Sequence, residues 1–131
     1  MADRCELTFL ERIAIAFETL ERQHRAYCDA LELAGADVIV LDADPTLADS
    51  VFIEDAAVVL DEVAIMTRPG AMSRRPEPDS IETGIRSFRN IARIVAPGTL
   101  EGGDVLRIGR KLYIGLTTRT NREGVEQFAA L

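Results

Sequence analysis

Two stretches of the sequence repeat one order of predicted elements, and this repeat constrains the fold more than any other feature. Aligning Asp55 with Asp104 gives, in each stretch, a strand, a short turn, a second strand, a loop with an arginine and a helix, at a period of roughly 49 residues. The loop arginine of the second stretch, Arg119, comes four residues sooner than Arg74 in the first. Any two hairpin–helix units look alike at this coarseness, but the matching charges favour a true repeat and an α/β fold.

Local patterns place the individual elements. Apolar residues at steps of three and four predict a helix over residues 13–34, with Gly35 at its C-terminal cap. A capping-box pattern at Asp79 opens a helix over about residues 80–91, and Asn121 is expected to cap the last helix. Strands are predicted over residues 37–41, 51–60, 63–68, 93–97, 104–109 and 111–117.

Composition narrows the class of protein. A chain of 131 residues that is 47% hydrophobic predicts one globular domain over residues 1–131. The net charge of −7, with no basic run free of acids, argues against nucleic acid as a partner. No apolar run approaches a membrane span, and the N-terminus does not resemble a signal peptide. Cys5 and Cys28 lack metal or redox spacing, so we expect a cytoplasmic protein with reduced thiols and no bound metal.

The charged residues stand at the ends of the predicted hairpins. In an antiparallel hairpin the start of the first strand lies beside the end of the second, so Asp55 should lie near Arg74 and Glu101 near Arg119. Carboxylates beside arginines are suited to bind a small zwitterion with a cationic tail. A carboxylate accepts two hydrogen bonds from a guanidinium, and an arginine donates two hydrogen bonds to an α-carboxylate. The alternative is simple salt bridging at a sheet end. Glu54, adjacent to Asp55, would point to the opposite face of a regular strand.

Several of these segments together resemble a known family. The segments "DSVFIEDAAVV", "IMTRPGAMSRR", "LEGGDVL" and "GLTTRTN", preceded by "CELT" and "QHRAYCDAL", are similar to dimethylarginine dimethylaminohydrolase of the guanidine-modifying pentein superfamily. The resemblance runs from about Cys5 to the end of the chain. It implies a partial pentein-type α/β propeller of strand–strand–helix–strand repeats, in which residues 1–131 correspond to about the N-terminal half of a catalytic domain.

The resemblance also implies a reaction and roles for particular acids. The family hydrolyses methylated arginine to citrulline and a methylamine without a metal or cofactor, through a cysteine nucleophile and a histidine acid–base. Asp55 would hold the substrate guanidinium. Glu54 and Glu101 would position or polarise the histidine, which makes Glu101 the residue implied for catalysis.

Further residues are implied at the amino-acid end of the substrate. The backbone at Leu7, in a flap loop, and Asp49 would help to hold the α-amino group. Arg74 and Arg119 would hold the α-carboxylate. The implied ligands are guanidino amino acids such as methylarginine, arginine and citrulline.

The sequence departs from the family because the histidine and cysteine of the second half are missing from it. His24 and Cys28 sit on one predicted helix, where a packed or solvated role is more common than a catalytic one. Cys5 precedes the flap, where a thiol needs a basic partner to become a good nucleophile. The first hypothesis is therefore an N-terminal portion of an amidinohydrolase that has little activity alone. The alternatives are a non-catalytic guanidino-ligand-binding module or a structural module. In each case we expect self-association, or association with a complementary C-terminal half, because a shortened propeller exposes strand edges.

Overall fold

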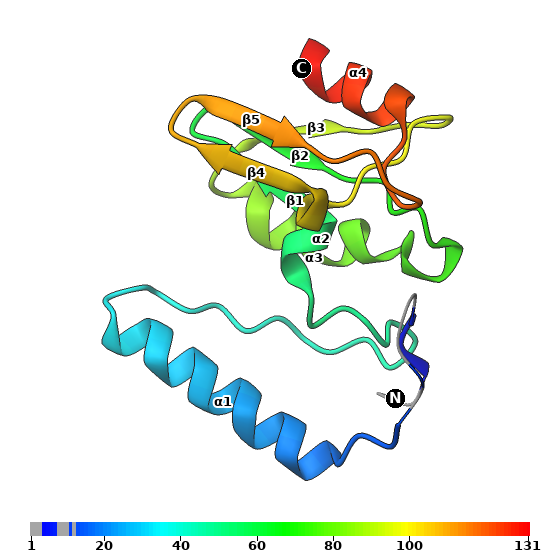
Figure 1. Cartoon of the computed structure of the whole chain (residues 1–131). Helices are drawn as coiled ribbons and strands as arrows, with labels where there is room; N and C mark the ends of the chain where they lie inside the picture. The colour runs from blue at the N-terminus through cyan, green and yellow to red at the C-terminus, as the bar shows by residue number, and fades with distance from the viewer. Residues whose placement is uncertain (1–3, 8–10, 12) are drawn as a thin grey trace. The chain divides into compact units, whose positions relative to one another are not determined.

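The computed structural model describes residues 4–7, 11 and 13–131 of the chain (Figure 1). These residues form two compact units, residues 1–49 and residues 50–131, and each unit is described by itself. The division does not test the prediction that residues 1–131 correspond to half of one catalytic domain, which stays a prediction.

The first unit contains one long helix, α1 (Phe17–Leu33). The predicted glycine cap is confirmed, because Gly35 has a φ of 92° and its N–H donates to the carbonyl of Glu32 at 2.9 Å. The strand predicted over residues 37–41 is wrong, since these residues form no ladder. Their apolar run resembles a strand, but a strand needs a hydrogen-bonded neighbour, and none pairs with it among the described residues.

The second unit begins with a short helix and a three-stranded sheet. The helix α2 (Ile53–Ala56) precedes the strands β1 (Ala57–Val59) and β2 (Val63–Met66), which pair antiparallel as the hairpin prediction required. The strand predicted over residues 51–60 is therefore too long, because its first half is a helical turn. β3 (Asn90–Arg93) pairs parallel with β2, and the sheet order is β1-β2-β3.

The helix between β2 and β3 begins earlier and ends earlier than predicted. A 3₁₀ turn, η2 (Met72–Arg74), leads to α3 (Glu77–Arg86), whose N-cap is Pro76 rather than Asp79. The predicted capping box is wrong, since no side chain caps the helix. Ile91, assigned by its spacing to the helix, instead pairs with Ala64 in the parallel ladder. The backbone hydrogen bonds of the sheet thus override the local helical pattern.

The second hairpin matches its prediction closely. β4 (Val105–Ile108) and β5 (Lys111–Ile114) pair antiparallel around Gly109, which has a φ of 61°. A 3₁₀ turn, η3 (Gly102–Asp104), precedes this hairpin as α2 precedes the first. The last helix, α4 (Arg122–Ala130), is capped by Asn121, whose side chain accepts from the N–H of Gly124 at 2.8 Å.

Two small cores hold the second unit together. Ile65, Ile94, Leu100 and Phe128 form one, and Ala56, Met66 and Ile81 form the other. β2 contributes to both cores through Ile65 and Met66, whose side chains point to opposite faces of the sheet. The described residues show an α/β arrangement with no closed sheet. The partial propeller of strand–strand–helix–strand repeats stays a prediction.

The turns that precede the two hairpins, α2 and η3, meet at Gly102. A Cβ at this position would clash with the backbone carbonyl of Glu54 in α2. We expect Gly102→Ala to lower the free energy of unfolding by about 1–3 kcal/mol, because a backbone atom cannot move aside as a side chain can. Gly115→Ala is the control, since its Cβ would meet no atom closer than 3.8 Å. Urea denaturation of both variants gives the comparison, and equal stabilities would contradict the close approach.

Candidate functional site

Four charged side chains from separate elements of the second unit converge at the starts and ends of the two hairpins. Asp55 comes from α2, Arg74 from η2, Glu101 from the residue before η3, and Arg119 from the loop after β5. Their ion pairs, given below, join the four into one group. Glu77, at the start of α3, also pairs with Arg74, and we call these five residues, Asp55, Arg74, Glu77, Glu101 and Arg119, the acid–arginine cluster.

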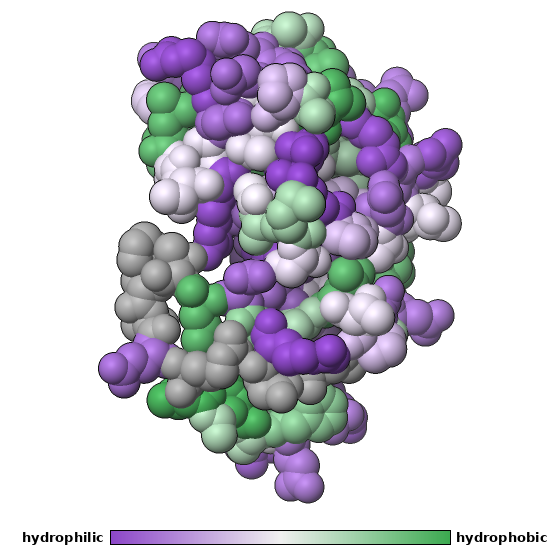
Figure 2. Space-filling view, turned by 90° about the vertical axis from the view of Figure 1, so that its right-hand side faces the viewer, coloured by the Kyte–Doolittle hydropathy of each residue, from purple (hydrophilic) through white to green (hydrophobic). Residues whose placement is uncertain are grey.

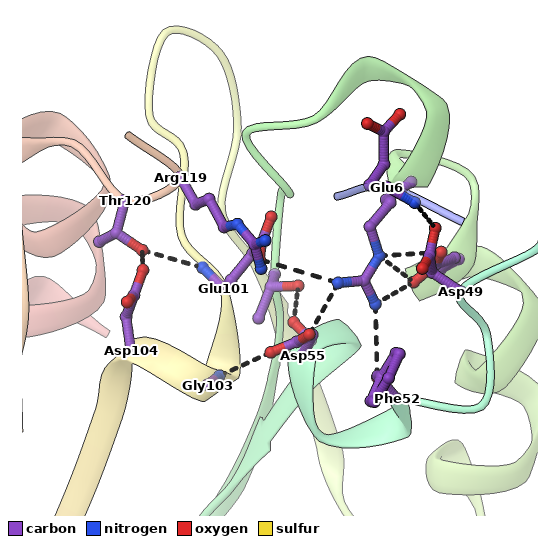
Figure 3. A network of polar contacts seen from close by, with 12 residues as sticks. Glu6, Asp49, Phe52, Asp55, Glu101, Gly103, Asp104, Arg119 and Thr120 are labelled. Carbon is purple, nitrogen blue, oxygen red and sulfur yellow. Dashed lines mark hydrogen bonds and ion pairs between the residues drawn. The ribbon is translucent and has the colours of Figure 1, made fainter. Parts of the chain in front are cut away.

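Asp55 is held by contacts with Arg74 of η2 and with Gly103 of η3 (Figure 3). One carboxylate oxygen, Oδ2, accepts from Arg74 Nη1 at 2.7 Å, and the other, Oδ1, accepts from the backbone N–H of Gly103 at 2.9 Å. The Asp55 carbonyl accepts from the Thr67 hydroxyl at 2.7 Å. Asp55 is buried, so its charge is stabilised by these donors rather than by water.

Arg74 is the central cation, with only 5% of its side chain exposed. Its Nε donates to both carboxylate oxygens of Glu77, at 3.0 and 3.1 Å, and its Nη2 donates to Glu77 Oε2 at 2.7 Å. Burial by itself would lower the pKa of Arg74, but the hydrogen bonds and negative charges of Glu77 and Asp55 raise it above the ordinary value. Arg74 is therefore a permanent positive charge in a buried position.

Glu101 has the least satisfied carboxylate of the cluster. Its Oε2 accepts from Arg119 Nη1 at 3.2 Å and lies 3.8 Å from Arg74 Nη1, while its Oε1 is buried without a hydrogen-bond partner among the described residues. Burial raises the pKa of Glu101, and the charge of Asp55 adds to this rise against the opposing effect of Arg119 and Arg74. A buried acceptor that lacks a donor is costly, which is typical of a group that receives a ligand or a second side chain.

The loop that carries Arg119 is fixed by hydroxyl groups. Asp104 Oδ2 accepts from the hydroxyls of Thr117 and Thr120, at 2.8 and 2.6 Å, and the Thr120 hydroxyl also accepts from the N–H of Glu101 at 3.1 Å (Figure 3). The side chain of Arg119 is 38% exposed, in contrast to the buried Arg74. The two arginines therefore occupy different environments.

The hairpin argument predicted the convergence of Asp55, Arg74, Glu101 and Arg119, and the structure places them together. Glu54 lies next to Asp55 in α2 but is exposed, and it takes part in none of the ion pairs given for the cluster. The functional roles of all these residues stay predictions.

Two predicted residues lie in the first unit. Asp49 Oδ2 accepts from the backbone N–H of Glu6 at 2.9 Å, next to Leu7, which is exposed (Figure 3). The hydrogen bond joins the backbone of Glu6, the residue before Leu7, to Asp49. The resemblance gives Leu7 and Asp49 a shared role at the α-amino end of the ligand. That shared role stays a prediction.

Sequence reasoning missed Glu77. Its signal was its position three residues after Arg74, a spacing that allows side chains to meet along a helical turn. The sequence predicted no contact for Glu77 because the helix was expected to begin at about residue 80, which placed Glu77 in a loop.

The remaining reactive side chains lie in the first unit. Cys28 Sγ is 3.9 Å from His24 Nδ1, one turn along α1. Within the described part of the chain, no group of three or more histidine, cysteine or acidic residues is arranged to hold a metal ion. A search of the same residues finds no helix both long and apolar enough to cross a membrane.

Comparison with known proteins supplies the family. The family model described as N,N dimethylarginine dimethylhydrolase, eukaryotic, matches residues 8–131. The chain is 44% identical over 111 residues to the N(G),N(G)-dimethylarginine dimethylaminohydrolase of Pseudomonas aeruginosa, an alignment that covers 83% of this chain and 44% of that protein. It is 42% identical over 125 residues to the protein of the same name from Streptomyces coelicolor, covering 95% of this chain and 48% of that protein.

Solved structures agree with these matches. A mutant of the Pseudomonas aeruginosa enzyme complexed with citrulline superposes with a TM-score of 0.91 at 40% identity, covering 95% of this chain and 49% of that one. A cyanobacterial arginine dihydrolase shares the fold, with a TM-score of 0.72 at 22% identity over 84% of this chain and 43% of that one. The chain therefore has the α/β fold of the pentein proteins. It belongs to the dimethylarginine dimethylaminohydrolase family, and it spans about half the length of the curated relatives that it matches.

The raised pKa of Glu101 predicts a pH-dependent stability. The folded state binds this proton more tightly than the unfolded state, so the stabilisation is present below the ordinary pKa of 4.5 and is lost as the pH rises through the folded pKa. We expect the stability of Glu101→Gln relative to the parent chain to increase between about pH 4 and about pH 7. Urea denaturation at both pH values measures this change. Glu126→Gln, on the exposed side of α4, is the control, and an equal pH trend in both variants would contradict the assignment.

Proposed function

We propose that the chain forms the substrate-binding portion of an amidinohydrolase that hydrolyses methylated arginine to citrulline and methylamine. The observation that carries this proposal is the pair of buried carboxylates, Asp55 and Glu101, facing the guanidinium groups of Arg74 and Arg119. An arrangement of both charges at one site matches a ligand that has a cationic guanidinium and an α-carboxylate. The citrulline complex of the Pseudomonas aeruginosa relative supports this class of ligand.

Within this proposal each charged residue has a part. Asp55 holds the guanidinium, which would complete the coordination of a carboxylate already oriented by Gly103. Arg119, partly exposed beside Glu101, pairs with the α-carboxylate together with Arg74. Leu7 and Asp49 hold the α-amino end.

Glu101 and Glu54 serve the acid–base group. The unpartnered Glu101 Oε1 offers a buried acceptor to an imidazolium N–H, which would stabilise the charged form of a histidine. Glu54 supports the same histidine. The chemistry needs a thiolate to attack the guanidinium carbon and a proton donor for the departing amine, after which water releases citrulline.

Those two reacting groups are not part of the acid–arginine cluster. Cys5, Cys28 and His24, the described cysteines and histidine, lie in the first unit, and Cys28 and His24 lie along α1. We therefore assign binding and orientation of the ligand to this chain, with the guanidinium and α-carboxylate contacts in residues 50–131. The thiolate and the imidazole would come from a complementary C-terminal half, and the chain alone would show little hydrolysis.

Ligand binding tests this function. We expect citrulline, L-arginine and methylarginine to bind the chain in titration calorimetry, and Asp55→Asn to weaken the binding of the cationic ligands by more than about tenfold, as for the loss of one member of a buried charge pair. Asp61→Asn is the matched control, because this exposed acid pairs with Arg107 outside the cluster. The absence of heat with millimolar ligand, or equal weakening by both substitutions, would refute the proposal.

Apolar surface on the second hairpin favours a second candidate, a module that associates with its own copies. Leu106 and Tyr113 are paired across the ladder, and Ile108 lies two residues along on the same face; all three are largely exposed. A neighbouring pocket is lined mainly by apolar residues, among them Ile65, Leu112, Ile114 and Phe128. Figure 2 shows the side of the molecule that lies to the right in Figure 1, where hydrophobic residues are scattered among hydrophilic ones. An exposed apolar face on a two-stranded ladder, such as that of Leu106, Ile108 and Tyr113, is typical of an interface.

Light scattering during size-exclusion chromatography tests self-association. We expect the chain to elute as a dimer or larger species at micromolar concentration, and Leu106→Lys to shift it towards the monomer, because the charge would be desolvated at the interface. Leu33→Lys is the control, since Leu33 is exposed on α1 in the other unit. A monomer over the whole concentration range would exclude this candidate.

A further inference from the structure

Glu77 is the acid–arginine cluster member to which neither the repeat nor the resemblance gave a role. It is as buried as Glu101, with 2% of its side chain exposed. A buried carboxylate is costly unless its charge is compensated, and the partner here is the guanidinium of Arg74. The presence of this carboxylate in the interior of a small unit therefore needs an explanation other than solubility.

The geometry of the pair gives that explanation. The carboxylate of Glu77 lies along one edge of the guanidinium, where Arg74 Nε and Nη2 both donate to it. Two or more bonds along one edge fix the plane of a guanidinium, which a single bond does not. With that edge held, Nη1 faces Asp55 Oδ2 at 2.7 Å and lies 3.8 Å from Glu101 Oε2.

The local backbone prepares Glu77 for this contact. It is the first residue of α3, between Pro76 and Pro78, whose rings restrict the chain at the turn from η2 into the helix. The positive end of the helix dipole lies at this position and stabilises the carboxylate charge. The Ser80 hydroxyl donates to the Glu77 carbonyl at 2.7 Å, which further anchors the first turn.

We infer that Glu77 is a positioning residue that orients the Arg74 guanidinium for the α-carboxylate of the ligand. The inference rests on the proposed function. Glu77 itself would not touch the ligand. It fixes Arg74, whose charge then balances Asp55 and Glu101 and faces the ligand's carboxylate from a set direction.

The first experiment compares two ligands in titration calorimetry. Citrulline carries the α-carboxylate, whereas agmatine is a guanidine without it. We expect Glu77→Gln to weaken citrulline binding by about tenfold or more and agmatine binding by less than about twofold, because only the former uses Arg74. Asp79→Asn, an exposed acid in the same helical turn that pairs with Arg93, is the matched control and should change neither affinity. Equal effects of Glu77→Gln on the two ligands, or no effect, would overturn the inference.

A double-mutant cycle separates positioning from a general effect on folding. If Glu77 acts through Arg74, the affinity of Glu77→Gln combined with Arg74→Lys for citrulline should equal that of Arg74→Lys alone within about twofold. Independent losses that multiply would show that Glu77 acts by another route and would contradict the inference.

A measurement without ligand keeps the inference distinct from the proposed function. The Arg74 Nε–H resonance, assigned by its loss in Arg74→Lys, should exchange with solvent at least about tenfold faster in Glu77→Gln than in the parent chain. If the parent chain binds no citrulline, the proposed function fails, and this exchange rate still decides whether Glu77 holds Arg74. Equal exchange rates in the two proteins would refute the inference.

Discussion

A buried guanidinium between three carboxylates organises residues 50–131. Arg74 contacts Asp55 and Glu77 directly and lies near Glu101, and these acids come from the start of the first hairpin, the start of α3 and the start of the second hairpin. Each acid alone would be costly to bury, and so would the arginine. The pairing makes burial of one group conditional on the others, so the four elements must meet in one arrangement.

Close backbone approach makes that meeting possible. Gly102 lies against the carbonyl of Glu54, and the N–H of Gly103 reaches the Asp55 carboxylate. The short helical turns α2 and η3, one before each hairpin, are thereby brought into contact. A side chain larger than hydrogen at Gly102 would push η3 away from α2. The N–H of Gly103 would then no longer reach the Asp55 carboxylate. The backbone contact at Gly102 and the ion pairs of the acid–arginine cluster therefore depend on each other. A substitution that disturbs one is expected to weaken the other.

The two loop arginines, Arg74 and Arg119, lie in different environments. Arg74 is enclosed by acids, while Arg119 is partly exposed beside Glu101. An enclosed arginine can orient charges, and a partly exposed one can meet a ligand without full desolvation. Under the proposed function both arginines would pair with the α-carboxylate, Arg74 from a buried position and Arg119 from a partly exposed one. Oε2 of Glu101 lies within 3.8 Å of Arg74 Nη1 and 3.2 Å of Arg119 Nη1, so this carboxylate links the two arginines.

The sequence by itself determined the features that depend on neighbouring residues. Gly35 and Gly109 adopt positive φ values, Asn121 caps α4, and the two hairpins bring Asp55 to Arg74 and Glu101 to Arg119. Only the tertiary structure decided which of the predicted helices and strands actually form and which charges are buried. In the part of the chain that the structure describes, the apolar run 37–41 has no strand partner, and Ile91 joins the β2 ladder instead of a helix. Glu77 is enclosed with Arg74 because η2 and α3 meet there. Turn and cap geometry is set within a few residues, whereas strand pairing and the burial of charge depend on groups that are distant along the chain.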